Sequence, residues 1–310
     1  MNAYHAPVRP SHARTVGWLV VGVLAVGSAG VLLKAAEAPS ATLAAYRLLG
    51  GGLPLLTWAA VRGQLRAVGR GAGWLLLAQV ALAGHFLLWI ASLRDTSVAA
   101  SVVLVTMQPV FALPLAWAWG EGWAPRSTLY GVALAAAGVA VMAGGDALAG
   151  GPAVRGDALA IGGAACAAVY LVAGRRLRAR VGVVAYAGAA YSGAGCLVLA
   201  YALARGLPLT GFSLHTWALI GAVTLGPQLT GHTALNWALG YLRAETVATA
   251  VLGEPVVATA LAAVALGERP TAAQWVGGVV ILGGVWITVR GELRAVRATV
   301  PIRRERGGPG

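Results

Sequence analysis

Long apolar runs follow one another along almost the whole chain, each bounded by arginine, glycine, proline or an acidic residue. Runs of about 18 to 22 residues recur, and an α-helix of that length crosses a hydrocarbon layer roughly 30 Å thick. The connections are short, so little chain remains for a separate soluble domain. The pattern predicts ten membrane-spanning helices, at residues 16–33, 42–61, 73–92, 96–118, 127–145, 157–174, 183–204, 214–239, 245–266 and 272–289.

Motifs in the first half of the chain recur in the same order in the second half. Gln108-Pro109-Val110 resembles Glu254-Pro255-Val256. Glycines seven residues apart mark the last predicted helix of each half and are expected to permit close helix contact; they are Gly131 and Gly138, and Gly277 and Gly284. Each half has five predicted helices, an odd number, so the two halves must enter the membrane from opposite sides. The chain is therefore predicted to be an all-α integral membrane protein of two inverted five-helix repeats, at residues 16–146 and 156–290.

Composition agrees with a membrane protein and argues against other classes. Of the 310 residues 58% are apolar and only 11% are charged, far from the usual mix of a soluble domain. The net charge of +13 comes from arginines dispersed in short loops, so no nucleic-acid partner is predicted, because such a site needs clustered cations. Cys166 and Cys196 both lie in apolar runs, so no disulfide framework, no metal site of the CxxC type and no cofactor is expected.

The basic residues are distributed unevenly between alternate connections. Seventeen lysines and arginines lie in the terminal segments and one set of connections, whereas five lie in the opposite set. Cytoplasmic segments carry the excess of positive charge in membrane proteins. The chain is therefore predicted to be a multi-pass protein of the cell membrane with both termini in the cytoplasm, as a short segment at residues 1–15 and a basic tail at 291–310.

The eighth predicted helix carries a polar stripe with a spacing of four residues, formed by Thr224, Gln228, His232 and Asn236. These side chains would share one helical face. Polar groups at membrane depth are costly against lipid, so the stripe is expected to line a cavity, although hydrogen bonding between packed helices is the alternative. Pro227 cannot donate a backbone hydrogen bond, so the helix is predicted to be kinked or locally opened there.

Two further pairs of polar residues lie inside predicted spans. His85 and Trp89 would place an imidazole and an indole on one face, the histidine acting either as a proton relay or as an interhelical donor. Gln108 and Glu254 hold equivalent places before a proline in the two halves. Glu254 is interpreted as a proton-coupling carboxylate or a ligand for a substrate amine, the alternative being a neutral acid that caps carbonyls freed by Pro255.

These residues predict a substrate site near the middle of the membrane, between the two halves. Its expected lining is His85, Trp89, Gln108, Gln228, His232, Asn236 and Glu254. Arg47 lies near the start of the second predicted helix and is expected to snorkel toward the membrane surface, with attraction of an anion as the alternative.

The order and duplication of these motifs resemble a known family. The segments 85–90, 96–99 and 108–111 in the first half, and 266–269, 274–277 and 283–284 in the second, resemble the EamA-type repeats of the drug/metabolite transporter superfamily. The resemblance covers roughly residues 15 to 290. It implies a ten-helix fold with both termini cytoplasmic, alternating access, and export of amino acids, metabolites or toxic compounds, but it does not name the substrate.

The expected function is thus secondary transport across the lipid bilayer, namely export of a small metabolite, amino acid or drug-like compound by alternating access. Whether a proton is the coupling ion or the chain is a passive facilitator stays open, as does a homodimer. An intramembrane lipid-modifying enzyme is a further alternative. It is disfavoured because no HExxH, GxSxG or GxxxxGK motif is present, so no enzymatic activity is predicted.

Overall fold

The computed structural model describes residues 10–96, 98–147, 154–266 and 270–298. Within these residues all regular secondary structure is helical and no strand occurs, so the predicted all-α class is confirmed. The helices are α1 (His12–Val26), α2 (Ala29–Ala35), α3 (Ser40–Val61), α4 (Leu65–Gly69), α5 (Ala72–Asp95), α6 (Val98–Val105), α7 (Gln108–Ala116), η1 (Trp117–Glu121), α8 (Arg126–Ala147), α9 (Val154–Arg178), α10 (Val183–Ala204), α11 (Leu214–Val223), η2 (Thr224–His232), α12 (Thr233–Ala238), α13 (Ala244–Val251), α14 (Glu254–Leu266) and α15 (Ala272–Ala298).

Seven helical segments of the described chain are long and apolar enough to cross a membrane. They are Ala13–Ala35, Ala72–Asp95, Ala100–Glu121, Val154–Arg178, Val183–Ala204, Ala244–Leu261 and Ala272–Ala295. The remaining predicted spans contain α3, α8 and the run from α11 to α12. Of these three, α3 contains the charged Arg47, and the run from α11 to α12 contains the polar stripe. The third, α8, contains a shorter apolar helix, Arg126–Met142. The ten-span arrangement therefore stays a prediction.

Several helical runs are interrupted near the middle of the bundle, where prolines occur. A break separates α6 from α7 just before Gln108-Pro109, and another separates α13 from α14 just before Glu254-Pro255. Proline is tolerated in the first turn of a helix, where its missing N–H would have no partner. Pro227 lies inside the π-helix η2, so the predicted local opening of this helix is confirmed.

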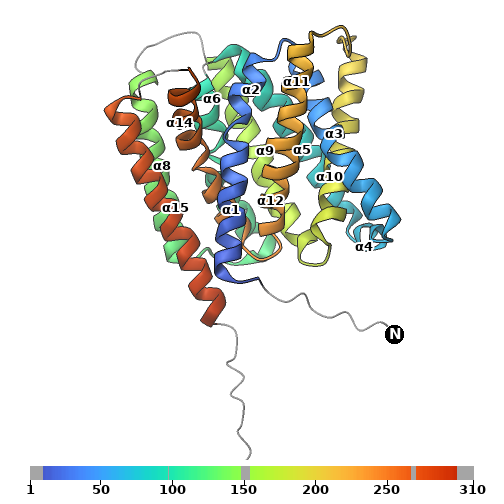
Figure 1. Ribbon diagram of the computed structural model, residues 1–310. Coiled ribbons are helices and arrows are strands. Elements are labelled where there is room, and N and C mark those ends of the chain that lie inside the picture. Colours follow the sequence, from blue (N-terminus) through green and yellow to red (C-terminus); the bar gives the residue numbers. More distant parts are fainter. Residues whose placement is uncertain (1–9, 97, 148–153, 267–269, 299–310) are drawn as a thin grey trace, which may run out of the picture.

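Three close helix pairs join residues before position 148 to residues after position 153. These pairs are α8 with α15, α3 with α10 and α5 with α9. In Figure 1, α8 and α15 form one edge of the bundle, and α3 and α10 lie near the other. The predicted close approach of the seven-spaced glycines is confirmed in the first pair: a Cβ atom on Gly284 would lie 2.4 Å from the Gly131 carbonyl oxygen.

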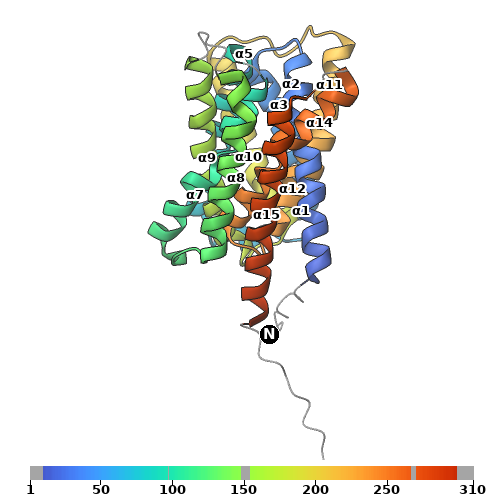
Figure 2. The same cartoon turned by 90° about the vertical axis from the view of Figure 1, so that its left-hand side faces the viewer.

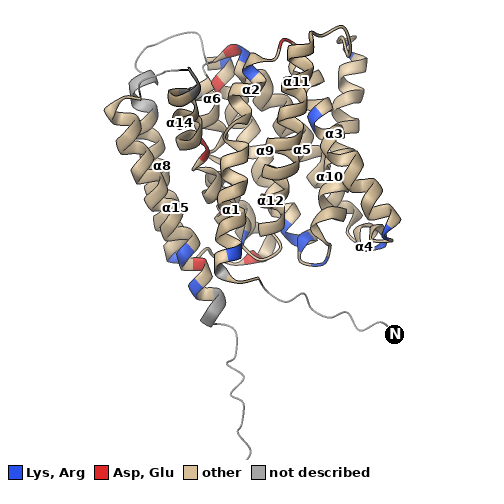
Figure 3. Ribbon diagram, in the orientation of Figure 1, with Lys and Arg blue, Asp and Glu red and all other residues tan. Residues whose placement is uncertain are grey.

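The two ends of the bundle carry the charge, and its middle is almost free of it (Figure 3). The described chain enters through α1 and leaves through α15 at the same end, as the two views in Figures 1 and 2 show. The predicted even number of spans requires both ends of the described chain to lie at the same end of the bundle. Most of the predicted segment 1–15 and of the predicted tail 291–310 lies outside the described residues.

Candidate functional site

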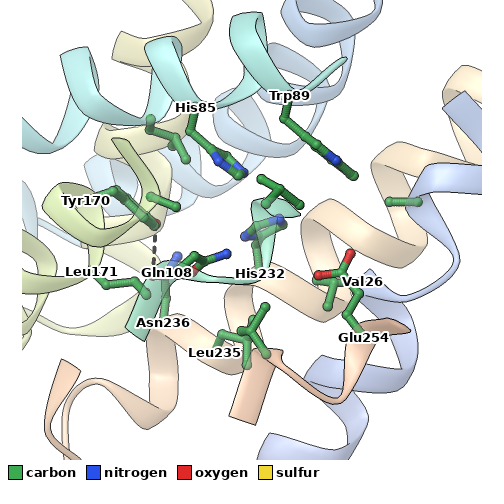
Figure 4. Close-up of a pocket in the computed structure, with 15 residues that line it drawn as sticks. Val26, His85, Trp89, Gln108, Tyr170, Leu171, His232, Leu235, Asn236 and Glu254 are labelled. Atoms are coloured by element: carbon green, nitrogen blue, oxygen red, sulfur yellow. Dashed lines mark hydrogen bonds between the residues drawn. The ribbon is translucent and has the colours of Figure 1, made fainter. Parts of the chain in front are cut away.

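A cavity lies between helices from both halves of the chain and collects most of the predicted site residues. Six of the seven line it: His85, Trp89, Gln108, His232, Asn236 and Glu254 (Figure 4). Tyr170 from α9 adds a hydroxyl that the sequence analysis missed. The remaining lining is aliphatic, from Val26, Ala29, Leu82, Val105, Ala167, Leu171, Leu235 and Val251. The arrangement is a small polar site enclosed by apolar walls.

The free volume of this cavity is about 30 Å³. A single water molecule needs roughly 10 to 15 Å³ of such space, so the cavity holds about two or three waters. A metabolite is far larger and cannot enter without movement of the surrounding helices. The cavity in this structure is therefore smaller than a substrate would need, and we call this its contracted form.

The two broken helices point their first residues at the cavity. Gln108 is the first residue of α7, and Glu254 is the first residue of α14. Both side chains are buried, and the Glu254 carboxylate is directed toward the space between Trp89 and His232 (Figure 4). The backbone N–H groups of a first helical turn have no partner within the helix and carry a partial positive charge. The two breaks therefore place polar backbone as well as side chains at the site.

Four aromatic side chains form a wall beside the same cavity: His85, Phe86 and Trp89 of α5, and His232 of η2. We call them the aromatic wall. The rings of His85 and Trp89 are stacked, with centroids 5.9 Å apart and an interplanar angle of 14°. His85 Nδ1 lies 2.9 Å from the Gly163 carbonyl oxygen. Because a carbonyl only accepts hydrogen bonds, Nδ1 carries the proton of this bond and Nε2 is the remaining polar atom of the ring. The edge of Phe86 meets the ring of His232 across the wall, at 5.4 Å between centroids.

Asn236 is held by two tyrosines. The Tyr170 hydroxyl donates to Asn236 Oδ1 at 2.8 Å, and Asn236 Nδ2 donates to the Tyr191 hydroxyl at 2.7 Å. These bonds fix the orientation of the amide, because its oxygen accepts and its nitrogen donates. Tyrosine in an apolar run is ordinary in membrane helices, so the sequence pattern gave no signal that distinguished Tyr170.

Gln228 does not line the cavity, in contrast to the prediction. Its Oε1 accepts a hydrogen bond from Arg47 Nε at 3.0 Å. The expectation assumed the α-helical period, in which residues four apart share a face, whereas Gln228 lies in the π-helix η2 with its wider i to i+5 turn. The polar stripe therefore divides, with His232 and Asn236 facing the cavity and Gln228 facing α3.

The expectation that Arg47 snorkels toward the membrane surface is wrong. Its side chain is fully buried, with Cζ 4.2 Å from the centroid of the Phe86 ring and 5.9 Å from that of Trp89. Among the described residues no carboxylate forms an ion pair with Arg47, Glu254 included. The hydrogen bond that Arg47 donates to Gln228 and the contact with the Phe86 ring hold the guanidinium within the bundle, behind the aromatic wall.

Comparison with known proteins agrees with this architecture. The model of the EamA-like transporter family matches the chain twice, at residues 13–144 and 154–290. An uncharacterized transporter of Archaeoglobus fulgidus is 27% identical over 253 residues, which cover 79% of this chain and 86% of that protein. A solved crystal structure, described only as that of a protein, matches with a TM-score of 0.73 at 20% identity and covers 92% of this chain and 100% of its own. The last likeness concerns the fold alone. The chain belongs to the EamA-like transporter family and is a membrane transporter of small molecules.

Proposed function

We propose that this transporter exports a small metabolite, amino acid or drug-like compound by alternating access, with the central cavity as its substrate site. The observation that carries the proposal is that residues of both halves line one buried polar cavity. A site between two repeats is exposed to either side of the membrane when the repeats rock against each other. The contracted cavity fits a state between these two exposures.

The proposed substrate contacts are His85, Trp89, Gln108, His232, Asn236 and Glu254, with Gln228 as an indirect contributor through Arg47. The amides and imidazoles offer hydrogen bonds, and the indole offers a flat apolar face. Glu254 is the proposed coupling residue, since it is the carboxylate that lines the cavity in the described residues. It would bind a proton and the substrate in alternation, which makes the transporter a proton antiporter. A passive facilitator is the alternative. A pH gradient across the membrane should change the flux of an antiporter but not that of a facilitator.

The transport proposal is tested in purified protein reconstituted into liposomes. An untargeted comparison of compounds exported by cells with and without the gene first identifies the substrate. We expect flux of that compound without ATP, because the sequence holds no phosphate-cradling motif with which to use it. Empty liposomes and a reconstituted unrelated membrane protein serve as controls. Strict dependence of the flux on ATP, or no flux above that of empty liposomes, would contradict the proposal.

The proposed topology has two inverted repeats of five spans, both termini cytoplasmic and the arginine-rich end of the bundle inside. It is tested with single cysteines at exposed positions, in a variant in which Cys166 and Cys196 are alanine. In intact cells Arg66→Cys and Arg180→Cys should resist an impermeant thiol reagent, whereas Arg205→Cys at the opposite end should react. Labelling of the first two from outside would reverse the orientation. The same reagent added to broken cells checks that all three thiols are reactive.

A further inference from the structure

Arg47 is a buried cation whose hydrogen-bonding capacity is largely unused. Its Nε donates to Gln228, but the two terminal nitrogens, Nη1 and Nη2, have no partner within the part of the chain that the structure describes. A buried charge with unmet donors is strongly destabilising unless it is paired. The Phe86 ring, whose centroid lies 4.2 Å from Arg47 Cζ, offsets only part of this cost, because a ring face accepts no hydrogen bond from the two terminal nitrogens as good as that of an oxygen.

Two neighbours of Arg47 also have buried N–H groups that lack a hydrogen-bond acceptor among the described residues. These groups are Gln228 Nε2 and Trp89 Nε1. The assignment of the Gln228 amide follows from its bond, because Arg47 Nε can only donate and the atom facing it must be the oxygen. All the unmet polar groups of these three side chains are therefore N–H donors. A set of donors without acceptors is suited to a ligand that brings acceptor oxygens.

This set lies next to the proposed substrate site. Trp89 lines the cavity, and the Arg47 guanidinium lies on the Phe86 ring, whose other neighbours His85 and His232 line it as well. Phe86 thus contacts both the guanidinium and the side chains that line the cavity. The cavity must enlarge to admit any metabolite, and movement of these rings would bring the guanidinium to the ligand.

The geometry and charge of these donors restrict the chemical class of the ligand further. Nη1 and Nη2 form a planar fork that matches the two oxygens of a carboxylate. Arg47 carries a single positive charge, which matches a monocarboxylate better than a dianion such as a phosphate monoester. The rings of Trp89 and His85 favour a flat apolar body.

We infer that Arg47, with Gln228 and the Trp89 indole, forms the carboxylate-binding part of the substrate site and selects monocarboxylates with a flat apolar body over the matching amides and amines. The inference rests on the proposed function only in taking this cavity as the substrate site. It concerns binding, so it is tested apart from transport.

The test measures thermal stabilisation and equilibrium binding of the purified protein in detergent. The probes share one ring and differ in one group: phenylacetate, phenylacetamide and phenethylamine, with indole-3-acetate and its amide as a second set. We expect wild-type protein to bind the carboxylates at least tenfold more tightly than the amides and amine. Arg47→Gln should abolish this preference, and Trp89→Phe, which keeps a ring but removes the N–H, should reduce it several-fold. Arg205→Gln is the control, because Arg205 is exposed at the end of α10.

Several results would overturn the inference. Equal binding of carboxylate and amide by the wild-type protein is one, and this comparison requires no variant to fold. Absence of carboxylate binding, or a preference that survives Arg47→Gln, is another. If Arg47→Gln with Glu254→Gln is more stable than either single variant and wild-type protein binds no carboxylate, Arg47 is an internal partner of Glu254 instead. Carboxylate binding without flux in liposomes would contradict only the transport proposal, and flux of other compounds without carboxylate binding only this inference.

Discussion

Glu254→Gln is expected to leave the transporter folded and to remove the acceleration of export by an acidic exterior. Glutamine keeps the shape and the hydrogen-bonding atoms of the protonated acid but cannot exchange a proton. Glu254 is buried at the first turn of α14, where its side chain faces the cavity. If its proton and the substrate bind in alternation, loss of the proton site abolishes coupling. Residual flux should then be insensitive to the pH gradient.

The measurement is flux from liposomes loaded with the exported compound, with and without an acidic exterior. Glu37→Gln is the matched control, because Glu37 is an exposed carboxylate away from the cavity. His85 and His232 line the same cavity and the Arg47 charge lies behind it, so His85→Gln and His232→Gln are measured in parallel. Should Glu254→Gln keep the full pH dependence while a histidine variant loses it, the coupling group is that histidine. If all three variants keep the pH dependence, none of these groups couples the proton, and if wild-type flux does not respond to the gradient, the chain is a passive facilitator.

The helical class and the gathering of six predicted side chains around one cavity could be predicted from the sequence, because both depend on local chemistry. Pro109 and Pro255 lack an N–H, which favours a position in the first turn of a helix, and a helix begins one residue before each. Polar residues within apolar runs must find partners or a cavity. Six of the predicted side chains consequently face one cavity, although their contact with substrate stays a prediction.

Arg47 and Gln228 show where sequence reasoning fails. Snorkelling is inferred from distance along a helix, but burial of Arg47 depends on Phe86 of α5 and Gln228 of η2, which lie far away in sequence. The position of Gln228 depends on a π-turn, which shifts the register by about one residue and leaves no clear signal in the spacing of polar residues. Both errors concern tertiary contacts and backbone geometry that periodicity does not contain.

The amide of Asn236 depends on the tyrosines of two neighbouring helices. Tyr170 of α9 donates to its oxygen, and its nitrogen donates to Tyr191 of α10. Asn236 and Tyr170 line the cavity, whereas Tyr191 does not. The three residues therefore share one hydrogen-bond network but differ in access to a bound substrate. This difference allows a role in binding to be separated from a role in packing.

Asn236→Ala is expected to weaken substrate affinity by roughly tenfold, which corresponds to about 1.4 kcal/mol. The change removes a cavity-lining amide, which weakens binding, and it takes the Asn236 bond from both tyrosine hydroxyls, which lowers stability by about 1 to 3 kcal/mol for each hydroxyl left unpaired; Tyr191 keeps its contact with Thr233 Oγ1 at 3.4 Å. Tyr170→Phe should also weaken affinity, because this hydroxyl both lines the cavity and orients the amide. Tyr191→Phe removes the other bond to the same amide without changing the cavity lining, so it should lower the unfolding temperature while the affinity changes less than twofold. Binding of the exported compound and thermal unfolding are measured for all three variants. Equal losses of stability with unchanged affinity would make this network purely structural, because only a contact with substrate separates Tyr170 from Tyr191.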